Sequence, residues 1–125
     1  MKENLAIIQQ YFDAFNRFDV EGMLNLLDDK FKFYLFQNEV LNMEMKGKKQ
    51  FRELAEPSRD YLSSREQIII SAREVKQGIE VTTNYTAMFA VDLPHNQKAG
   101  ESTTRESKTI FSLKNGNILE MREYA

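Results

Sequence analysis

The sequence predicts an α+β domain in which helices from the first half of the chain cover one face of a sheet. Two observations carry this prediction. Apolar residues recur at helical spacing in the first half, interrupted by one short stretch that alternates with period two. From about residue 65 onward, β-branched and aromatic residues dominate, and turn signals separate the runs. The 125 residues suffice for one domain with one core.

Three helices are expected in the first half of the chain. Residues 4–18 form an amphipathic pattern with one apolar, partly aromatic face. The apolar stripe consists of Leu5, Ile8, Phe12 and Phe15. Asp19 is the expected N-cap of a second helix, because its carboxylate can accept the free amides of the next turn. A third helix begins at about Gly47, and Pro57 should kink or break it because proline lacks an amide donor.

Six strands are expected, two in an early hairpin and four in a C-terminal antiparallel meander. Apolar and charged residues alternate in the first of them, and a turn near Gln37 leads to the second. The predicted strands are residues 30–35, 40–45, 67–76, 79–93, 102–113 and 117–124. Asn115-Gly116 is the strongest turn signal, because glycine accepts positive φ freely.

The register of the last hairpin decides which way Glu123 points. A three-residue loop over 114–116 would place Glu123 inward, opposite Ser107. A two-residue loop over 115–116 would instead set Lys108 opposite Glu123 as an ion pair on the solvent side. A slip by one residue moves every side chain to the other face of the sheet. We favour the three-residue loop because it pairs apolar residues with apolar residues.

The composition excludes several kinds of chemistry. There is no cysteine, so disulfides, thiolate metal sites and cysteine nucleophiles are excluded. We see no Asp, Glu and His cluster with ligand spacing, and we expect neither a metal nor another cofactor. The one histidine, His95, lies in an expected loop, where a solvated side chain is far commoner than a catalytic one.

Charge and hydropathy limit the classes of binding partner that we expect for this protein. The formal net charge is −2, without the basic surplus that nucleic-acid binders usually gather on one face, so no nucleic acid is expected. No apolar run approaches the roughly 20 residues that span a bilayer, and the N-terminal residues do not resemble a signal peptide. We therefore expect no membrane partner and a cytoplasmic location.

Five segments, taken in order, carry a family resemblance. They are Tyr11–Met23, Leu27–Phe33, Lys46–Lys49, Phe111–Ile118 and Met121–Tyr124. Together they resemble the nuclear transport factor 2-like superfamily, in its SnoaL-like and ketosteroid isomerase-like branch. The resemblance implies a cone in which a curved antiparallel sheet wraps around three N-terminal helices and leaves an apolar pocket at one end. It also implies homodimers that pair through the outer face of the sheet.

The resemblance does not extend to the catalytic residues of the ketosteroid isomerases. Those enzymes use a carboxylate base on the first strand, with a tyrosine and a protonated aspartic acid as oxyanion donors. The tyrosine matches Tyr11, but the base position falls on Leu35 and the acid on about Thr109. A slip by one residue would put Tyr34 at the base position, where it is a poor base near neutral pH. We therefore expect no ketosteroid isomerase activity. SnoaL-type cyclisation also calls for an acidic residue in the deep sheet, and none stands at the matching position.

Other polar residues could still serve the pocket. Arg105 shares the strand phase of Phe111 and should face inward, where a pair with Glu123 could orient a water or hold a polar ligand group. Tyr11 is either a hydrogen-bond donor of the pocket or a core aromatic, and Arg105 is either a ligand anchor or a structural ion-pair partner. The candidate ligand-contacting residues are Tyr11, Phe15, Leu27, Leu35, Ala55, Tyr85, Phe89, Arg105, Thr109, Met121 and Glu123.

The predicted function is binding of a small apolar ligand with one polar handle, by a homodimer whose outer face includes Met88 and Ile110. One alternative is a lyase or isomerase in which Glu123 is the base and Arg105 and Tyr11 assist it. A second alternative is a dimeric interaction module with a filled core. Pocket volume separates this last reading from the others, because ligand sites usually enclose about 300 Å³ or more.

Overall fold

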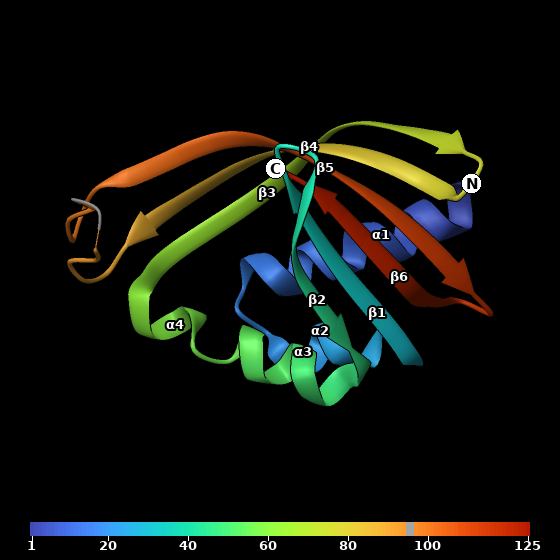
Figure 1. Cartoon of the computed structure of the whole chain (residues 1–125), viewed down its shortest axis with the longest axis horizontal. Coiled ribbons are helices and arrows are strands. Elements are labelled where there is room, and N and C mark those ends of the chain that lie inside the picture. Colours follow the sequence, from blue (N-terminus) through green and yellow to red (C-terminus); the bar gives the residue numbers. More distant parts are fainter. Residues whose placement is uncertain (95–96) are drawn as a thin grey trace.

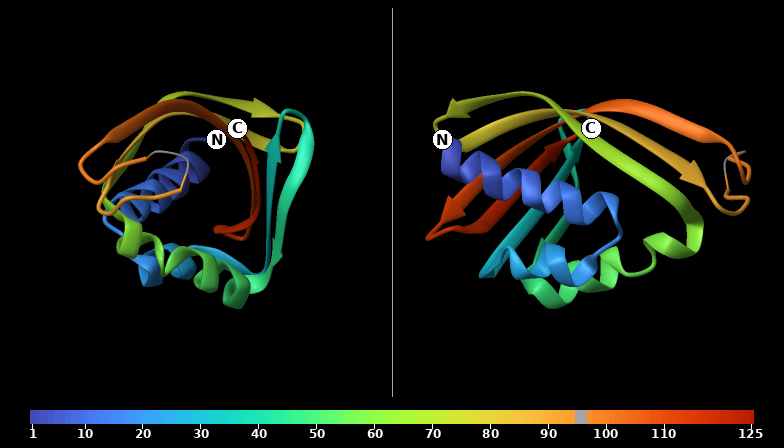
Figure 2. Two further views of the ribbon diagram at one scale, coloured as in Figure 1. Left: turned by 60° about the vertical axis from the view of Figure 1, so that its left-hand side comes forward. Right: turned by 180° about the vertical axis from the view of Figure 1, so that it is seen from behind.

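The computed structural model describes residues 1–94 and 97–125. Its elements are α1 (Lys2–Asn16), α2 (Val20–Asn25), β1 (Leu27–Gln37), β2 (Val40–Lys46), α3 (Gly47–Ala55), α4 (Ser58–Tyr61), β3 (Leu62–Val75), β4 (Gly78–Phe89), β5 (Ser102–Lys114) and β6 (Asn117–Tyr124). The strands form one sheet in the order β2-β1-β6-β5-β4-β3 (Figure 1). The sheet curves around α1, while α2, α3 and α4 lie across its open side (Figure 2). The predicted α+β cone is confirmed.

The helix boundaries follow local chemistry. The predicted N-cap of α2 is confirmed, because the Asp19 carboxylate accepts a hydrogen bond from the Gly22 amide at 2.9 Å. A Cβ atom at Gly22 would lie 2.3 Å from that carboxylate, so this position has no room for a side chain beside the cap. The predicted break at Pro57 is also confirmed. It separates α3 from the single-turn helix α4.

One strand pairing differs from the expected meander. Strand β1 pairs with β6 in parallel, with Phe33 opposite Met121 and Leu35 opposite Glu123. The other pairings are antiparallel, so the sheet is mixed and the prediction of a purely antiparallel sheet is wrong at this one boundary. The alternation of apolar residues in β1 reports which face is buried, but it carries no information about the direction of the neighbouring strand.

The last hairpin has a register that neither predicted loop describes. Its turn is the two-residue one at 115–116, so the favoured three-residue loop is wrong. A bulge then leaves Leu119 without a partner and shifts the pairing by one residue. The shift moves Glu123 from Lys108, its partner in the two-residue prediction, to Thr109. Glu123 therefore faces inward, as the three-residue loop would have required, but for a different reason.

A group of fully buried apolar side chains lies between α1 and the sheet. We call it the core end and define it by Ile8, Phe12, Val81, Phe111 and Ile118, none of which is more than 1% exposed. The rings of Phe12 and Phe111 meet edge to face, with centroids 5.7 Å apart. Such burial stabilises the fold by about 1.5–3 kcal/mol for each large apolar side chain.

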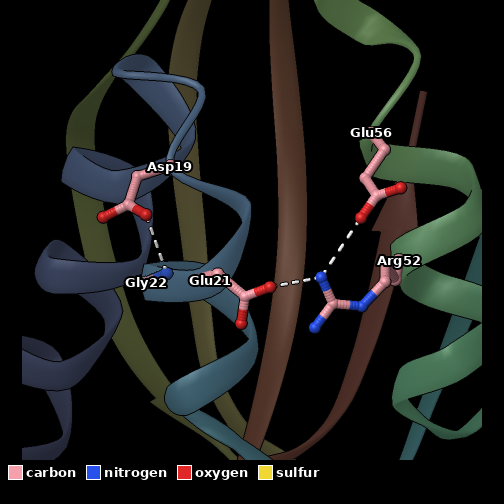
Figure 3. A network of polar contacts seen from close by, with 5 residues as sticks. All are labelled: Asp19, Glu21, Gly22, Arg52 and Glu56. Atoms are coloured by element: carbon pink, nitrogen blue, oxygen red, sulfur yellow. Dashed lines mark hydrogen bonds and ion pairs between the residues drawn. The ribbon is translucent and has the colours of Figure 1, made fainter.

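An exposed ion network joins α2 to α3 (Figure 3). The Arg52 guanidinium contacts the carboxylates of Glu21 and Glu56, the second at 3.1 Å. These partners raise the pKa of Arg52, and the hydrogen bond from Arg52 lowers the pKa of Glu21. Exposed pairs add little stability, so the network mainly orients α3 relative to α2.

In the ranges 1–94 and 97–125, no helix is long and apolar enough to cross a membrane.

Candidate functional site

A cavity of about 430 Å³ lies between the second half of α1, helices α3 and α4, and the concave face of the sheet. Its volume falls within the range of about 300–1,000 Å³ that is usual for small-molecule sites. Most of its wall is apolar and includes Phe15, Leu35, Ala55, Phe89 and Met121. These five residues were predicted from the sequence to line a pocket, and their contact with a ligand stays a prediction.

Leu27 is the one candidate contact residue that the structure places elsewhere. It is 2% exposed, does not line the cavity, and pairs with Ile118 at the beginning of β1. Leu27 lies in the core because β1 enters the sheet at the core end. The strand reaches the cavity only at Phe33 and Leu35.

The predicted pair of Arg105 and Glu123 is formed inside the cavity. Arg105 Nη2 and Glu123 Oε2 are 3.6 Å apart, and the two side chains are 45% and 19% exposed. The Arg105 guanidinium also lies over the Tyr85 ring, 5.2 Å from its centroid. Burial raises the pKa of Glu123, and the Arg105 charge opposes that effect only in part. The site therefore contains a carboxyl group that holds its proton more tightly than an exposed glutamate.

Tyr11 is packed as a core aromatic and also reaches the cavity, and its role as a hydrogen-bond donor to a ligand stays a prediction. It is 3% exposed and packs edge to face against Phe12 and Phe111, with centroids 5.6 and 6.1 Å away. It also lines the cavity. Burial, and next the nearby Glu123 carboxylate, raise the pKa of the Tyr11 hydroxyl, so it remains a proton donor at all ordinary pH values. Thr109 lies opposite Glu123, is 3% exposed and also lines the cavity.

Sequence reasoning missed Arg65, the most deeply buried cation of the cavity wall. Its side chain is only 8% exposed, and its Nε donates a hydrogen bond to the Phe15 carbonyl at 2.7 Å. The guanidinium stacks over Phe15 and Phe18, at 3.7 and 4.4 Å from the ring centroids. The predicted strand began at Gln67, which left Arg65 in a connection. Its position two residues before Gln67, on the same strand phase, was the signal that could have revealed it.

A second buried polar pair lies beside Arg65 on the same face. The Thr83 hydroxyl donates to Gln67 Oε1 at 2.7 Å. The Asn16 side chain forms two hydrogen bonds with the Gln67 backbone. It accepts one from the amide at 2.8 Å and donates one to the carbonyl at 3.2 Å. These contacts join the end of α1 to β3 and position the strand that carries Arg65.

The described part of the structure contains no cluster of side chains suited to binding a metal ion. Across residues 1–94 and 97–125, no three His, Asp or Glu side chains gather in a way that could hold an ion. The single histidine, His95, which we expected in a solvated loop, lies outside the described residues.

The profile of the SnoaL-like domain matches residues 8–121. The chain belongs to the SnoaL-like family. This membership confirms the resemblance drawn from the sequence, and the cone of this SnoaL-like chain agrees with it. No curated protein matches the chain significantly.

Solved structures with the same fold cover nearly all of this SnoaL-like chain. A protein from Xanthomonas campestris pv. campestris, provisionally named a polyketide cyclase, superposes with a TM-score of 0.81 at 16% identity, covering 99% of this chain and 90% of its own. A protein from Jannaschia sp. CCS1, provisionally named a SnoaL-like polyketide cyclase, gives 0.78 at 14%, covering 98% and 84%. A hypothetical protein from Catenulispora acidiphila with a ketosteroid isomerase-like fold, in complex with trimethylamine, gives 0.77 at 11%, covering 95% and 84%. At these identities the likeness shows the fold alone.

Proposed function

We propose that this SnoaL-like protein binds a small apolar ligand with one polar handle in its cavity. One observation carries the proposal. An ion pair, Arg105 with Glu123 at 3.6 Å, stands on the wall of a cavity of about 430 Å³ whose lining is mostly apolar. An apolar wall favours an apolar ligand body, and a few convergent polar groups orient the ligand.

The wall chemistry supports this reading further. Phe15 and Tyr85 meet edge to face at 5.8 Å, and Met23, Met43 and Met121 provide adaptable contact surface. The structural neighbour from Catenulispora acidiphila is in complex with a small molecule, trimethylamine. A small ligand in this fold therefore has a precedent, although its identity does not transfer to this chain.

A thermal-shift screen tests the proposal. The panel contains small apolar carboxylates, enones and sterols, and a ligand that binds only the folded state must raise the melting temperature. We expect at least one hit on the unmodified protein, weakened in Arg105→Ala. Arg122→Ala is the matched control, because Arg122 makes a similar ion pair with Glu120 at 3.4 Å and does not line the cavity. No stabilisation by any member of the panel contradicts the proposal.

Acid–base catalysis of the lyase or isomerase type is a second candidate function. The base position implied by the ketosteroid isomerase resemblance is occupied by Leu35, which cannot accept a proton. Glu123 lies directly beside Leu35 on the neighbouring parallel strand, and both side chains line the cavity. Burial raises the pKa of Glu123, which is the direction expected of a carboxyl group that takes part in proton transfer. An ordinary glutamate pKa at this position would contradict this candidate.

The homodimer predicted from the sequence stays a proposal, with the outer sheet face as the interface. Met88 and Ile68 support it, because they are 41% and 54% exposed on the outer face of β4 and β3. Light scattering of the 14.7 kDa chain tests it, and a monomer at micromolar concentration would contradict it.

The cytoplasmic location stays a prediction, which cell fractionation checks. A cavity of about 430 Å³ argues against an interaction module with a filled core.

A further inference from the structure

One nitrogen of the Arg65 guanidinium lacks a hydrogen-bond acceptor among the described residues. Among residues 1–94 and 97–125, the buried Nη2 of Arg65 finds no hydrogen-bond partner, although the Nε of the same group donates to the Phe15 carbonyl. A buried donor without a partner lowers the stability of the fold, and it does so more strongly when the group is charged. Arg65 also lines the cavity, so a molecule bound there lies against the guanidinium.

The positive charge of Arg65 also lacks an ion-pair partner among the described residues. Within residues 1–94 and 97–125, no carboxylate lies within 4.0 Å of its guanidinium, whereas Arg105 pairs with Glu123. Burial is the main influence on the pKa of Arg65 and lowers it, which expresses the poor solvation of its charge. A guanidinium nonetheless stays protonated in proteins. The stacked rings of Phe15 and Phe18 stabilise the cation but cannot accept its free N–H groups.

Three tyrosines share the cavity wall with this cation. Tyr11, Tyr61 and Tyr85 all lie near enough to influence the pKa of Arg65, and all three line the cavity. Tyrosine hydroxyls can donate hydrogen bonds to the same anion that pairs with an arginine. The surroundings of Arg65 are thus aromatic rings, neutral hydroxyls and a second guanidinium, that of Arg59, which stacks on the same Phe18 ring, and this setting suits a singly charged organic anion.

Arg65 and the Arg105–Glu123 pair are two separate polar places in the same cavity. Strand β4 lies between β3, which carries Arg65, and β5, which carries Arg105. Two strand spacings correspond to about 10 Å. Apolar and aromatic wall lies between them, including Ala87 and Tyr85, which pair with Arg65 and Arg105 across the sheet. A ligand that reaches both places needs a polar group at each end of an apolar body.

We propose that Arg65 binds the carboxylate of the ligand, so that the ligand class is an apolar, ring-containing monocarboxylate. This inference rests on the proposed function, because it identifies the chemistry of a ligand in the same cavity. A carboxylate fits better than a phosphate, because a dianion would meet a single buried cation here and the Glu123 carboxyl across the cavity. The neutral polar handle of the ligand is then left for the Arg105–Glu123 pair.

A pair of probes with the same shape separates charge from apolar binding. The two probes are 2-naphthoate and 2-naphthamide, and titration calorimetry gives the Kd of each. We expect the unmodified protein to bind the carboxylate about tenfold more tightly than the amide, or more, as suits a hydrogen bond to a charged group. Arg65→Gln should bring the two Kd values close together. Arg65→Lys is the second variant, for use if the glutamine variant fails to fold. It retains the charge, so it should keep part of the preference for the carboxylate.

Arg59→Gln is the matched control. Arg59 also stacks on Phe18, at 5.0 Å from the ring centroid, and donates to a backbone carbonyl, that of Arg17, at 3.1 Å. It does not line the cavity, so this variant should keep the preference for the carboxylate. Retention in Arg59→Gln and loss in Arg65→Gln would separate ligand binding from the structural role of a stacked arginine.

Three results would overturn the inference, and they differ in what they leave standing. Equal binding of naphthoate and naphthamide refutes the anion site but leaves the apolar cavity as a ligand site. A carboxylate preference that survives Arg65→Gln and disappears in Arg105→Ala places the anion at Arg105 instead. Absence of binding by both probes, together with an empty thermal-shift panel, refutes the inference and the proposed function at once.

Discussion

The two ends of the cone interior are built on the same strands and differ in what those strands turn inward. On β5, Phe111 belongs to the core end and is fully buried, whereas Thr109 and Ser107 continue the same inward phase at 3% and 2% exposure. Arg105 follows on that phase and lines the cavity. We call the second region the pocket end and define it by Arg65, Gln67, Tyr85, Arg105 and Glu123.

The comparison shows that inward orientation and apolar packing are separate properties of a sheet. Alternation along a strand decides only which side chains turn inward. At the core end those side chains are apolar and fill the space, and burial contributes to stability. At the pocket end polar side chains stand among apolar ones, and the described part of the chain leaves a cavity and an unpaired Arg65 donor. Buried polar groups in such a place are costly for stability, which favours a functional explanation for them.

Truncation of an aromatic at the core end should have the largest effect. Phe111→Ala should lower the free energy of unfolding by about 3–5 kcal/mol, because it leaves a void among fully packed rings. Leu54→Ala is the control at the cavity, where the leucine is 41% exposed, and should lower it by about 1 kcal/mol or less. Urea unfolding measures both. Equal losses in the two variants would remove the distinction between the two ends.

Removal of the Thr83 hydroxyl should have an intermediate effect at the pocket end. Thr83→Val preserves the shape of the side chain but leaves Gln67 Oε1 without its donor, at a cost of about 1–3 kcal/mol. Thr86→Val is the control, because Thr86 on the outer face of β4 shares an exposed hydrogen bond with Thr104 at 3.2 Å. Its loss should be about 0.5 kcal/mol or less, as for other surface changes. A Thr83→Val variant as stable as the control would show that the pocket end does not depend on its polar pairs.

The smallest effect should be a pH dependence of stability that originates at Glu123. Burial raises the pKa of this carboxyl in the folded state, so the folded state binds its proton more tightly than the unfolded state. Above the ordinary glutamate pKa, and up to the raised value, the free energy of unfolding therefore falls as pH rises. Glu123→Gln removes this loss, so its stability relative to the unmodified protein should improve as the pH rises above the ordinary glutamate pKa of about 4 and should level off above the raised pKa.

Glu120→Gln is the control for that experiment, because Glu120 lies on the same strand and pairs with Arg122 at 3.4 Å outside the cavity. Chemical denaturation at each pH value gives the stability of all three proteins. A stability difference between Glu123→Gln and the unmodified protein that stays constant with pH would contradict a raised pKa. It would also weaken the case for acid–base chemistry at this residue.

Much of the fold could be predicted because its signals are local. The Asp19 cap, the break at Pro57 and the turn at 115–116 each depend on the conformational preferences of a few neighbouring residues. The apolar stripe of α1 and the alternation along β1 reveal their buried faces for the same reason. The place of Leu27 could not be predicted in this way, because a buried apolar residue looks the same in sequence whether it fills a core or lines a cavity.

By itself the sequence determined the family, the helices and strands, and the inward phase that brings Arg105 into the cavity. The tertiary structure decided the parallel pairing of β1 with β6 and the bulge at Leu119, which together set Glu123 beside Leu35 and opposite Thr109. It also decided that Arg65 is buried without an anion. Strand direction, bulges and charge pairing depend on residues far apart in the chain, so their energies are settled only when the sheet closes around α1.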